Sequence, residues 1–186
     1  MTASITNGTY NNALPLSLLY DRLHELIYDN HIIHADETSV KVMWIDNNKI
    51  KNGKKTCMWV YRNRPTEKTR SIVLFDWQPS RKSDHPRDFL KNFSDIVITD
   101  GYQVCLKLGR ERDDLAIGGC RIHARHPFAD FIKSLKGAAD GTIAPEAYAM
   151  ITDMLHIENE FDDLPTVDRL KQRQLILTKK VDAYFA

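Results

Sequence analysis

Three carboxylates have the side-chain type needed to hold divalent metal ions: Asp36, Asp100 and Glu158. Asp36 follows the apolar run His31–Ala35 and Asp100 follows the apolar run Ile96–Thr99, so we expect both near strand ends. Carboxylate oxygens suit Mg²⁺ and Mn²⁺, and two such ions can activate an attacking oxygen and stabilise a leaving oxygen at a phosphodiester. Taken singly, each aspartate is more simply explained as an ordinary strand-end turn residue.

Glu158 is the more informative carboxylate. A helix is predicted near residues 145–163, and at about 100° per residue Glu158 lies close to the centre line of its apolar stripe. We therefore expect the carboxylate to point at the sheet. Burying an unpaired carboxylate is costly, so Glu158 needs an arginine, a hydrogen-bond network or a metal ion, and both a buried salt bridge and a metal remain open. The stripe consists of Ala147, Met150, Ile151, Met154, Leu155 and Phe161.

The composition indicates an ordinary globular protein. The 186 residues are 42% hydrophobic and 27% charged, which suits one folded unit and excludes a disordered chain. The polar N-terminus lacks the features of a signal peptide, and no apolar run reaches the length of about 18 residues that a membrane span needs, so we expect no membrane association. Three widely spaced cysteines favour a reducing compartment, with the cytoplasm as the default.

The net charge gives no independent sign of a nucleic-acid partner, because 26 basic and 25 acidic side chains leave only +1. Basic residues nevertheless cluster in two stretches, 49–70 and 169–180. Such stretches suit phosphate contacts, although they are more often simply solvated surface.

The periodicity predicts a mixed α/β architecture. Residues 1–13 are expected to form a flexible arm and residues 14–186 the folded core. A first helix ends near Asp29-Asn30, and a meander of antiparallel strands follows, after which helices and strands alternate in a mixed sheet with helices on both faces. The predicted strands are 31–36, 39–45, 56–62, 71–77, 96–99 and 115–120, and the later helices are 86–93, 123–135 and 145–163. Trp44, Trp59 and Trp77 are expected to pack in the core.

Several short motifs occur in one order along the chain. They are H-A-D-E-T (34–38), M-W-V-Y-R (58–62), S-R-K-S-D-H-P (80–86), T-D-G-Y (99–102) and G-C-R-I-H-A-R-H-P-F (119–128), and H-I-E-N-E-F then precedes R-L-K-Q-R-Q. With them the chain resembles transposases of the insertion-sequence-66 family from about Leu14 to the C-terminus. The family's upstream region, which includes its segments for recognising DNA ends, is expected to be absent from these residues.

The resemblance implies a ribonuclease-H-like fold and the DDE mechanism. Asp36, Asp100 and Glu158 then become the catalytic and metal-holding triad for Mg²⁺ or Mn²⁺, separated by intervals of 64 and 58 residues. The implied reaction is phosphodiester hydrolysis and strand transfer on insertion-sequence DNA ends. The implied partners are transposon-end and target DNA, and a homo-oligomer on DNA is possible.

The chain departs from the family pattern in one motif. The family's C-W-A-H-A-R-R-K-F reads C-R-I-H-A-R-H-P-F here, so Arg121 replaces a tryptophan, His126 an arginine and Pro127 a lysine. Cys120 and His123 have C-x-x-H spacing, but a zinc site needs about four ligands and no second pair is evident. We therefore favour a structural or DNA-positioning role for this segment over zinc.

A further set of side chains could contact DNA, because arginine pairs with phosphate and an aromatic ring can stack on an unpaired base. These are Tyr61, Arg62, Arg64, Arg81, His123 and Arg125. His34 should share a strand face with Asp36, whereas Glu37 should point the other way. Two alternatives stay open: a degenerate, non-catalytic DNA-binding or assembly fragment of a transposase, and a ribonuclease-H-like nuclease of another kind.

Overall fold

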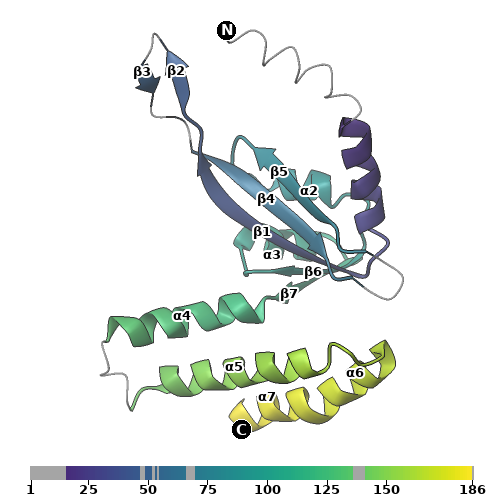
Figure 1. The fold of residues 1–186 in the computed structure, drawn as a ribbon, viewed down its shortest axis with the longest axis vertical. Coiled ribbons are helices and arrows are strands. Elements are labelled where there is room, and N and C mark those ends of the chain that lie inside the picture. The colour runs from purple at the N-terminus through teal and green to yellow at the C-terminus, as the bar shows by residue number, and fades with distance from the viewer. Residues whose placement is uncertain are drawn as a thin grey trace. The chain divides into compact units, whose positions relative to one another are not determined.

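The computed structural model describes residues 16–46, 49–51, 53, 55–65, 70–135 and 141–185. The chain divides into two compact units, Met1–Gly119 and Cys120–Ala186. The first unit contains the sheet and the second is helical (Figure 1). The arm expected at residues 1–13 lies outside the described residues.

A five-stranded sheet with the strand order β5-β4-β1-β6-β7 organises the first unit. The antiparallel meander is confirmed: β1 (Ile32–Lys41) pairs with β4 (Lys55–Asn63), which pairs with β5 (Val73–Gln78). On the other side, β6 (Asp95–Thr99) and β7 (Leu115–Gly119) run parallel to β1. The helices α2 (Asp84–Phe89) and α3 (Gln103–Glu111) flank the sheet (Figure 1). The result is the predicted α/β class, consistent with a ribonuclease-H-like fold.

A separate two-stranded sheet lies beyond the end of β1. It pairs β2 (Trp44–Asp46) with β3 (Lys49–Lys51) in antiparallel fashion. The predicted strand at residues 39–45 was therefore wrong in its bounds. Its first residues continue β1, and the chain leaves the main sheet at residues 42 and 43 before β2 begins.

The core of the first unit lies on one face of the sheet, because side chains alternate along each strand. Ile33 and Ala35 of β1 are buried, as are Trp59 and Tyr61 of β4. They pack against a helix at residues 16–27, against α2 and the turn after it, and against α3. The buried residues of these segments include Ile27, Phe89, Leu90, Phe93, Cys105 and Leu108. The first helix ends close to its predicted position.

The tryptophans illustrate this alternation. Trp59 is fully buried, as predicted, but Trp77 is 50% exposed and its indole N–H donates to Thr56 Oγ1 at 3.1 Å. The core prediction for Trp77 was therefore wrong, because Trp77 lies on the opposite face of the edge strand β5 from the buried Leu74. The Trp44 side chain lies outside the described residues.

The second unit consists of helices. α4 (Arg121–Ser134) and α5 (Ile143–Glu160) match the two predicted helices, whereas α6 (Thr166–Gln172), the π-helical segment η1 (Arg173–Thr178) and α7 (Lys179–Phe185) were not predicted. A small apolar cluster of Met154, Phe161 and Leu177 joins α5 to η1. This cluster fixes the register between the C-terminal helices and α5.

Replacing Asn63 with alanine should destabilise the first unit. The fully buried Asn63 amide donates to the Arg70 carbonyl at 2.8 Å and accepts the Ile72 N–H at 2.6 Å, so it closes the connection between β4 and β5. The free energy of unfolding should fall by about 1–3 kcal/mol, because two partly buried backbone groups lose their partner. Denaturant unfolding measures this, with the exposed Asn92→Ala as the control; equal stability of the two variants would contradict the prediction.

Candidate active site

Asp36 and Asp100 lie at equivalent levels of two neighbouring strands. β1 and β6 run parallel in a register in which partners differ by 64 residue numbers, ending with His34 opposite Ile98. Asp36 and Asp100 differ by the same 64, so extending this register by two residues places one opposite the other. Both side chains are exposed, on the face opposite the core. Asp36 lies within β1 and Asp100 directly follows β6, so we expect the two carboxylates to lie near each other.

Local backbone contacts hold both carboxylates. The Tyr102 N–H donates to Asp100 Oδ1 at 2.9 Å, and Gly101 has a φ of 89°, a conformation that favours glycine. The Glu37 N–H likewise donates to Asp36 Oδ1 at 2.9 Å. Each carboxylate has a backbone donor on one oxygen, which restricts its orientation.

Glu37 lies on the core side of β1, as predicted, with its side chain only 3% exposed. Its carboxylate forms an ion pair with Arg81 and accepts a hydrogen bond from the Cys57 thiol at 3.2 Å. The Arg81 guanidinium also lies 4.7 Å from the centre of the Tyr102 ring. A chain of contacts thus runs from Glu37 through Arg81 to Tyr102, the residue whose N–H holds Asp100.

This network changes the interpretation of Arg81. The sequence suggested that Arg81 contacts DNA, but its guanidinium neutralises a buried carboxylate. A buried charge without a partner is costly, so Arg81 is held in place by Glu37. Its structural role is to connect β1 with the turn that follows Asp100.

Tyr61 requires a correction. It was a candidate for stacking on an unpaired DNA base, but its ring is fully buried and stacks on Phe89, with ring centres 3.4 Å apart. Burial also raises the pKa of the Tyr61 hydroxyl far above its usual value. The alternation along β4 places Tyr61 on the core face, so it cannot reach DNA in this fold.

Basic and imidazole groups lie close to Asp36 on the exposed face. His34 and Asp36 share this face of β1, and Arg62 pairs with His34 across the β1–β4 ladder. Partial desolvation, followed by the charges of Arg62 and Arg64, lowers the pKa of His34 and favours the neutral imidazole. Arg62 is exposed and Arg64 is half-buried, so both remain candidates for phosphate contact.

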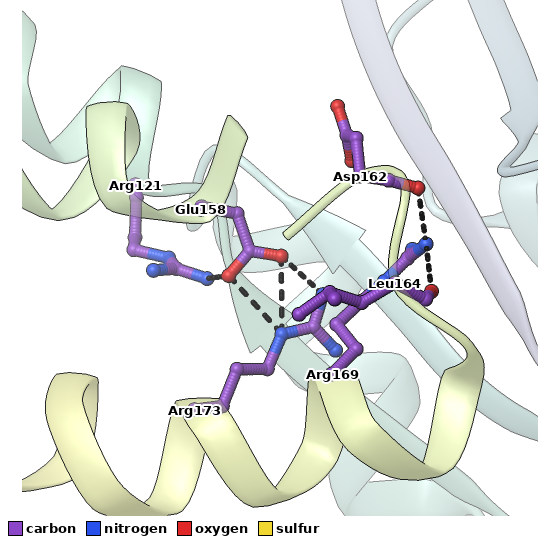
Figure 2. Close-up of polar contacts among 6 residues, drawn as sticks. All are labelled: Arg121, Glu158, Asp162, Leu164, Arg169 and Arg173. Carbon is purple, nitrogen blue, oxygen red and sulfur yellow. Dashed lines mark hydrogen bonds and ion pairs between the residues drawn. The ribbon is translucent and has the colours of Figure 1, made fainter. Parts of the chain in front are cut away.

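Glu158 lies in the helical unit, near the end of α5, and its side chain is only 12% exposed (Figure 2). Arg173 Nε donates to both carboxylate oxygens, at 3.0 and 3.1 Å, and Arg173 Nη2 also binds Oε1. Arg121 Nη2 lies 3.6 Å from Oε2. The buried salt bridge that the sequence left open is therefore present, and no three metal-binding side chains come together within the described residues.

The remaining DNA candidates lie on α4. The Arg125 guanidinium lies 5.5 Å from the centre of the Tyr148 ring on α5, and the rings of His123 and His126 meet edge to face with centres 5.6 Å apart. These contacts connect α4 internally and to α5. They give His123 and Arg125 a structural part within the helical unit, and their DNA contacts stay predictions.

The comparison with protein families identifies the chain. Residues 2–186 match the family described as "Transposase IS66 family". The chain belongs to the IS66 transposase family. No curated protein and no solved structure matched it in the corresponding searches. Within the described residues, none of the helices has the length and apolar composition that a membrane crossing requires.

The sequence interpretation of this transposase-family chain missed two arginine–carboxylate pairs. Arg173 binds Glu158, and Arg81 binds Glu37. The sequence interpretation placed Arg173 only in a basic stretch. In the structure it lies in η1, beyond the turn that follows α5 and beyond α6, and its side chain reaches back to Glu158. The predicted burial of Glu158 left an arginine partner open beside a metal ion, but a single sequence does not say which arginine folds back onto it. Glu37 gave no signal of its own, because a charged residue in a strand is usually solvated.

Replacing Arg81 with glutamine should destabilise the first unit through Glu37. The buried carboxylate would lose its cation, and the free energy of unfolding should fall by about 1–3 kcal/mol because Arg81 itself is half-exposed. Arg62→Gln is the matched control, since it removes an exposed arginine from the neighbouring strand β4. If denaturant unfolding shows the same small change in both variants, Arg81 does not have this role.

The three cysteines should differ sharply in reactivity. Burial, with Asp100 as a smaller cause, raises the pKa of Cys105 to about 12, and burial also raises the pKa of Cys57. Their thiolates are therefore scarce near pH 8, whereas Cys120 is partly exposed. Iodoacetamide should modify Cys120 in the folded protein and the other two only after unfolding, as mapped by mass spectrometry. Early modification of Cys57 or Cys105 would show that the core is open.

Proposed function

We propose that this chain is the catalytic core of a transposase that hydrolyses phosphodiesters and transfers strands at insertion-sequence DNA ends. Asp36, Asp100 and Glu158 supply the carboxylates that hold the divalent ions. The observation behind the proposal is the β1–β6 register: continued past its last pair, His34 and Ile98, it would set Asp36 beside Asp100, and both side chains are exposed. Membership of the transposase family supports the same reaction.

The donor set fits the implied metal. Asp36 and Asp100 offer hard oxygen ligands, and a backbone N–H restricts the orientation of each carboxylate. Mg²⁺ or Mn²⁺ bound there would supply activation of the attacking oxygen and charge stabilisation at the leaving oxygen. Arg62 and Arg64 would bind phosphates of the DNA backbone beside the aspartates. His34 would either orient Asp36 or contact a DNA phosphate.

The proposed partners follow from this chemistry. DNA ends and target DNA would be the substrates, a homo-oligomer would assemble on them, and the cytoplasm would be the site of action. The ion pairs of Glu158 favour a second candidate function. A chain whose third carboxylate stays bound to arginine would be a degenerate, non-catalytic DNA-binding or assembly fragment.

Replacing Asp36 with asparagine should abolish metal-dependent cleavage and leave the fold intact. Loss of a metal ligand should reduce Mn²⁺-dependent nicking of supercoiled plasmid DNA by about a hundredfold or more, since even the loss of groups that only orient ligands costs up to about this much. Asp113→Asn is the matched control: it changes an exposed aspartate just before β7, at the opposite end of the parallel strands from Asp100.

The controls separate the alternatives. Wild-type and Asp113→Asn protein should nick DNA equally, and an RNA–DNA hybrid should be a poorer substrate. Preference for the hybrid would indicate a ribonuclease-H-like nuclease of another kind. No metal-dependent cleavage and no Mn²⁺ binding, with or without DNA, would overturn the proposal in favour of the degenerate fragment.

A further inference from the structure

Glu158 is held by two arginines of its own helical unit. Both carboxylate oxygens accept hydrogen bonds from Arg173, and Arg121 adds a second positive charge at 3.6 Å from Oε2 (Figure 2). One negative and two positive charges leave this cluster with a net positive charge. A divalent cation is therefore repelled from Glu158 as long as both arginines remain.

The segment that carries Arg173 is fixed against α5. Leu177 of η1 is buried against Met154 and Phe161, and Arg169 Nη2 donates to the carbonyls of Asp162 and Leu164 at 2.7 and 3.1 Å (Figure 2). The backbone of the turn after α5 and the start of η1 is thus held independently of the Arg173 side chain. The Arg173 guanidinium can leave Glu158 without unfolding its helix, and at 33% exposure it can be reached by a solvent-side ligand.

A phosphate diester is the ligand whose chemistry competes best for these guanidinium groups. Arginine binds phosphate in the same two-pronged manner as carboxylate, and DNA presents many phosphates at once. Three of the other four cations in the basic stretch 169–180 have partners within the helical unit: Lys180 pairs with Asp153, Lys171 lies 3.8 Å from Asp168, and Arg169 binds backbone carbonyls. Arg173 and Arg121 are the two cations whose transfer to DNA phosphates would free Glu158.

We propose that the Arg121–Glu158–Arg173 cluster is a DNA-released latch: DNA phosphates take both arginines, and only then does Glu158 accept a metal ion. This inference rests on the proposed function, because it assumes that Glu158 is a metal ligand. It makes metal binding and DNA binding mutually dependent, since each favours the same open arrangement. The chain would then remain without a complete metal site until DNA is bound.

The test measures Mn²⁺ binding by calorimetry, with and without a short DNA duplex, on wild type and on Arg173→Gln. Without DNA, Arg173→Gln should bind Mn²⁺ about tenfold or more tightly than wild type, because a hydrogen-bonded cation no longer competes. Adding Glu158→Gln to this variant should remove the gain. DNA should strengthen Mn²⁺ binding in wild type and much less in Arg173→Gln.

Two further variants keep the test decisive. Arg121→Gln removes the more exposed arginine, which lies beyond hydrogen-bond distance, so it should leave the fold intact and raise Mn²⁺ affinity by a smaller factor. Lys180→Gln is the matched control: it removes one positive charge from another ion pair of the same unit and should leave Mn²⁺ affinity unchanged. Thermal unfolding of each variant checks that the helical unit is folded.

Each outcome decides one of the two ideas. If wild type binds Mn²⁺ through Glu158 without DNA as tightly as Arg173→Gln does, the latch is wrong and the proposed function stands. If Lys180→Gln raises the affinity as much as Arg173→Gln, general charge explains the gain and the latch is again wrong. If no variant binds Mn²⁺ even with DNA, the proposed function fails and the latch fails with it.

Discussion

The parallel pairing of β1 with β6 is the constraint on which the proposed site depends. It joins the antiparallel meander to the parallel part of the sheet, and its offset of 64 residue numbers is also the interval between Asp36 and Asp100. A shift of one residue would move one aspartate to the core face, because strand side chains alternate. Ile33 and Val97 pair in this register and both are fully buried. Core packing therefore fixes the strand register on which the relative position of the two carboxylates depends.

Buried carboxylates paired with arginine recur in both units, with different consequences. Glu37 is almost fully buried on the core side of β1, and Arg81 connects it to the Tyr102 ring. Opening that pair would leave the buried Glu37 carboxylate without its cation, which is costly, so the pair is structural. Glu158 is more exposed, and its two arginines lie partly in solvent. Arg81 is itself 45% exposed, so the two pairs differ in their carboxylates, and the proposed exchange at Glu158 rests on the greater exposure of that carboxylate.

The sequence predicted what depends on local patterns. Alternation and turn residues located β1, β4, β5, β6 and β7, and the apolar stripe located α5 and the burial of Glu158. It failed where the outcome depends on which face an element presents: Tyr61 and Trp77 are both strand aromatics, yet only the first lies inside. The C-terminal helices were missed because the stretch from Arg169 to Lys180 was interpreted by its charge, although Leu177 packs in an apolar cluster.

In the proposed latch, arginine and metal are successive partners of Glu158, and charge balance gives the reason. Asp36, Asp100 and Glu158 together carry three negative charges, and Arg121 and Arg173 offset two of them when they bind Glu158. In the proposed site, the single net negative charge that remains would bind divalent cations weakly. DNA would change both sides of this balance at once, because its phosphates would bind the arginines and add negative charge next to the metal ions. Arg121, where the family pattern has a tryptophan, places a second cation at Glu158 and would strengthen this proposed dependence on DNA.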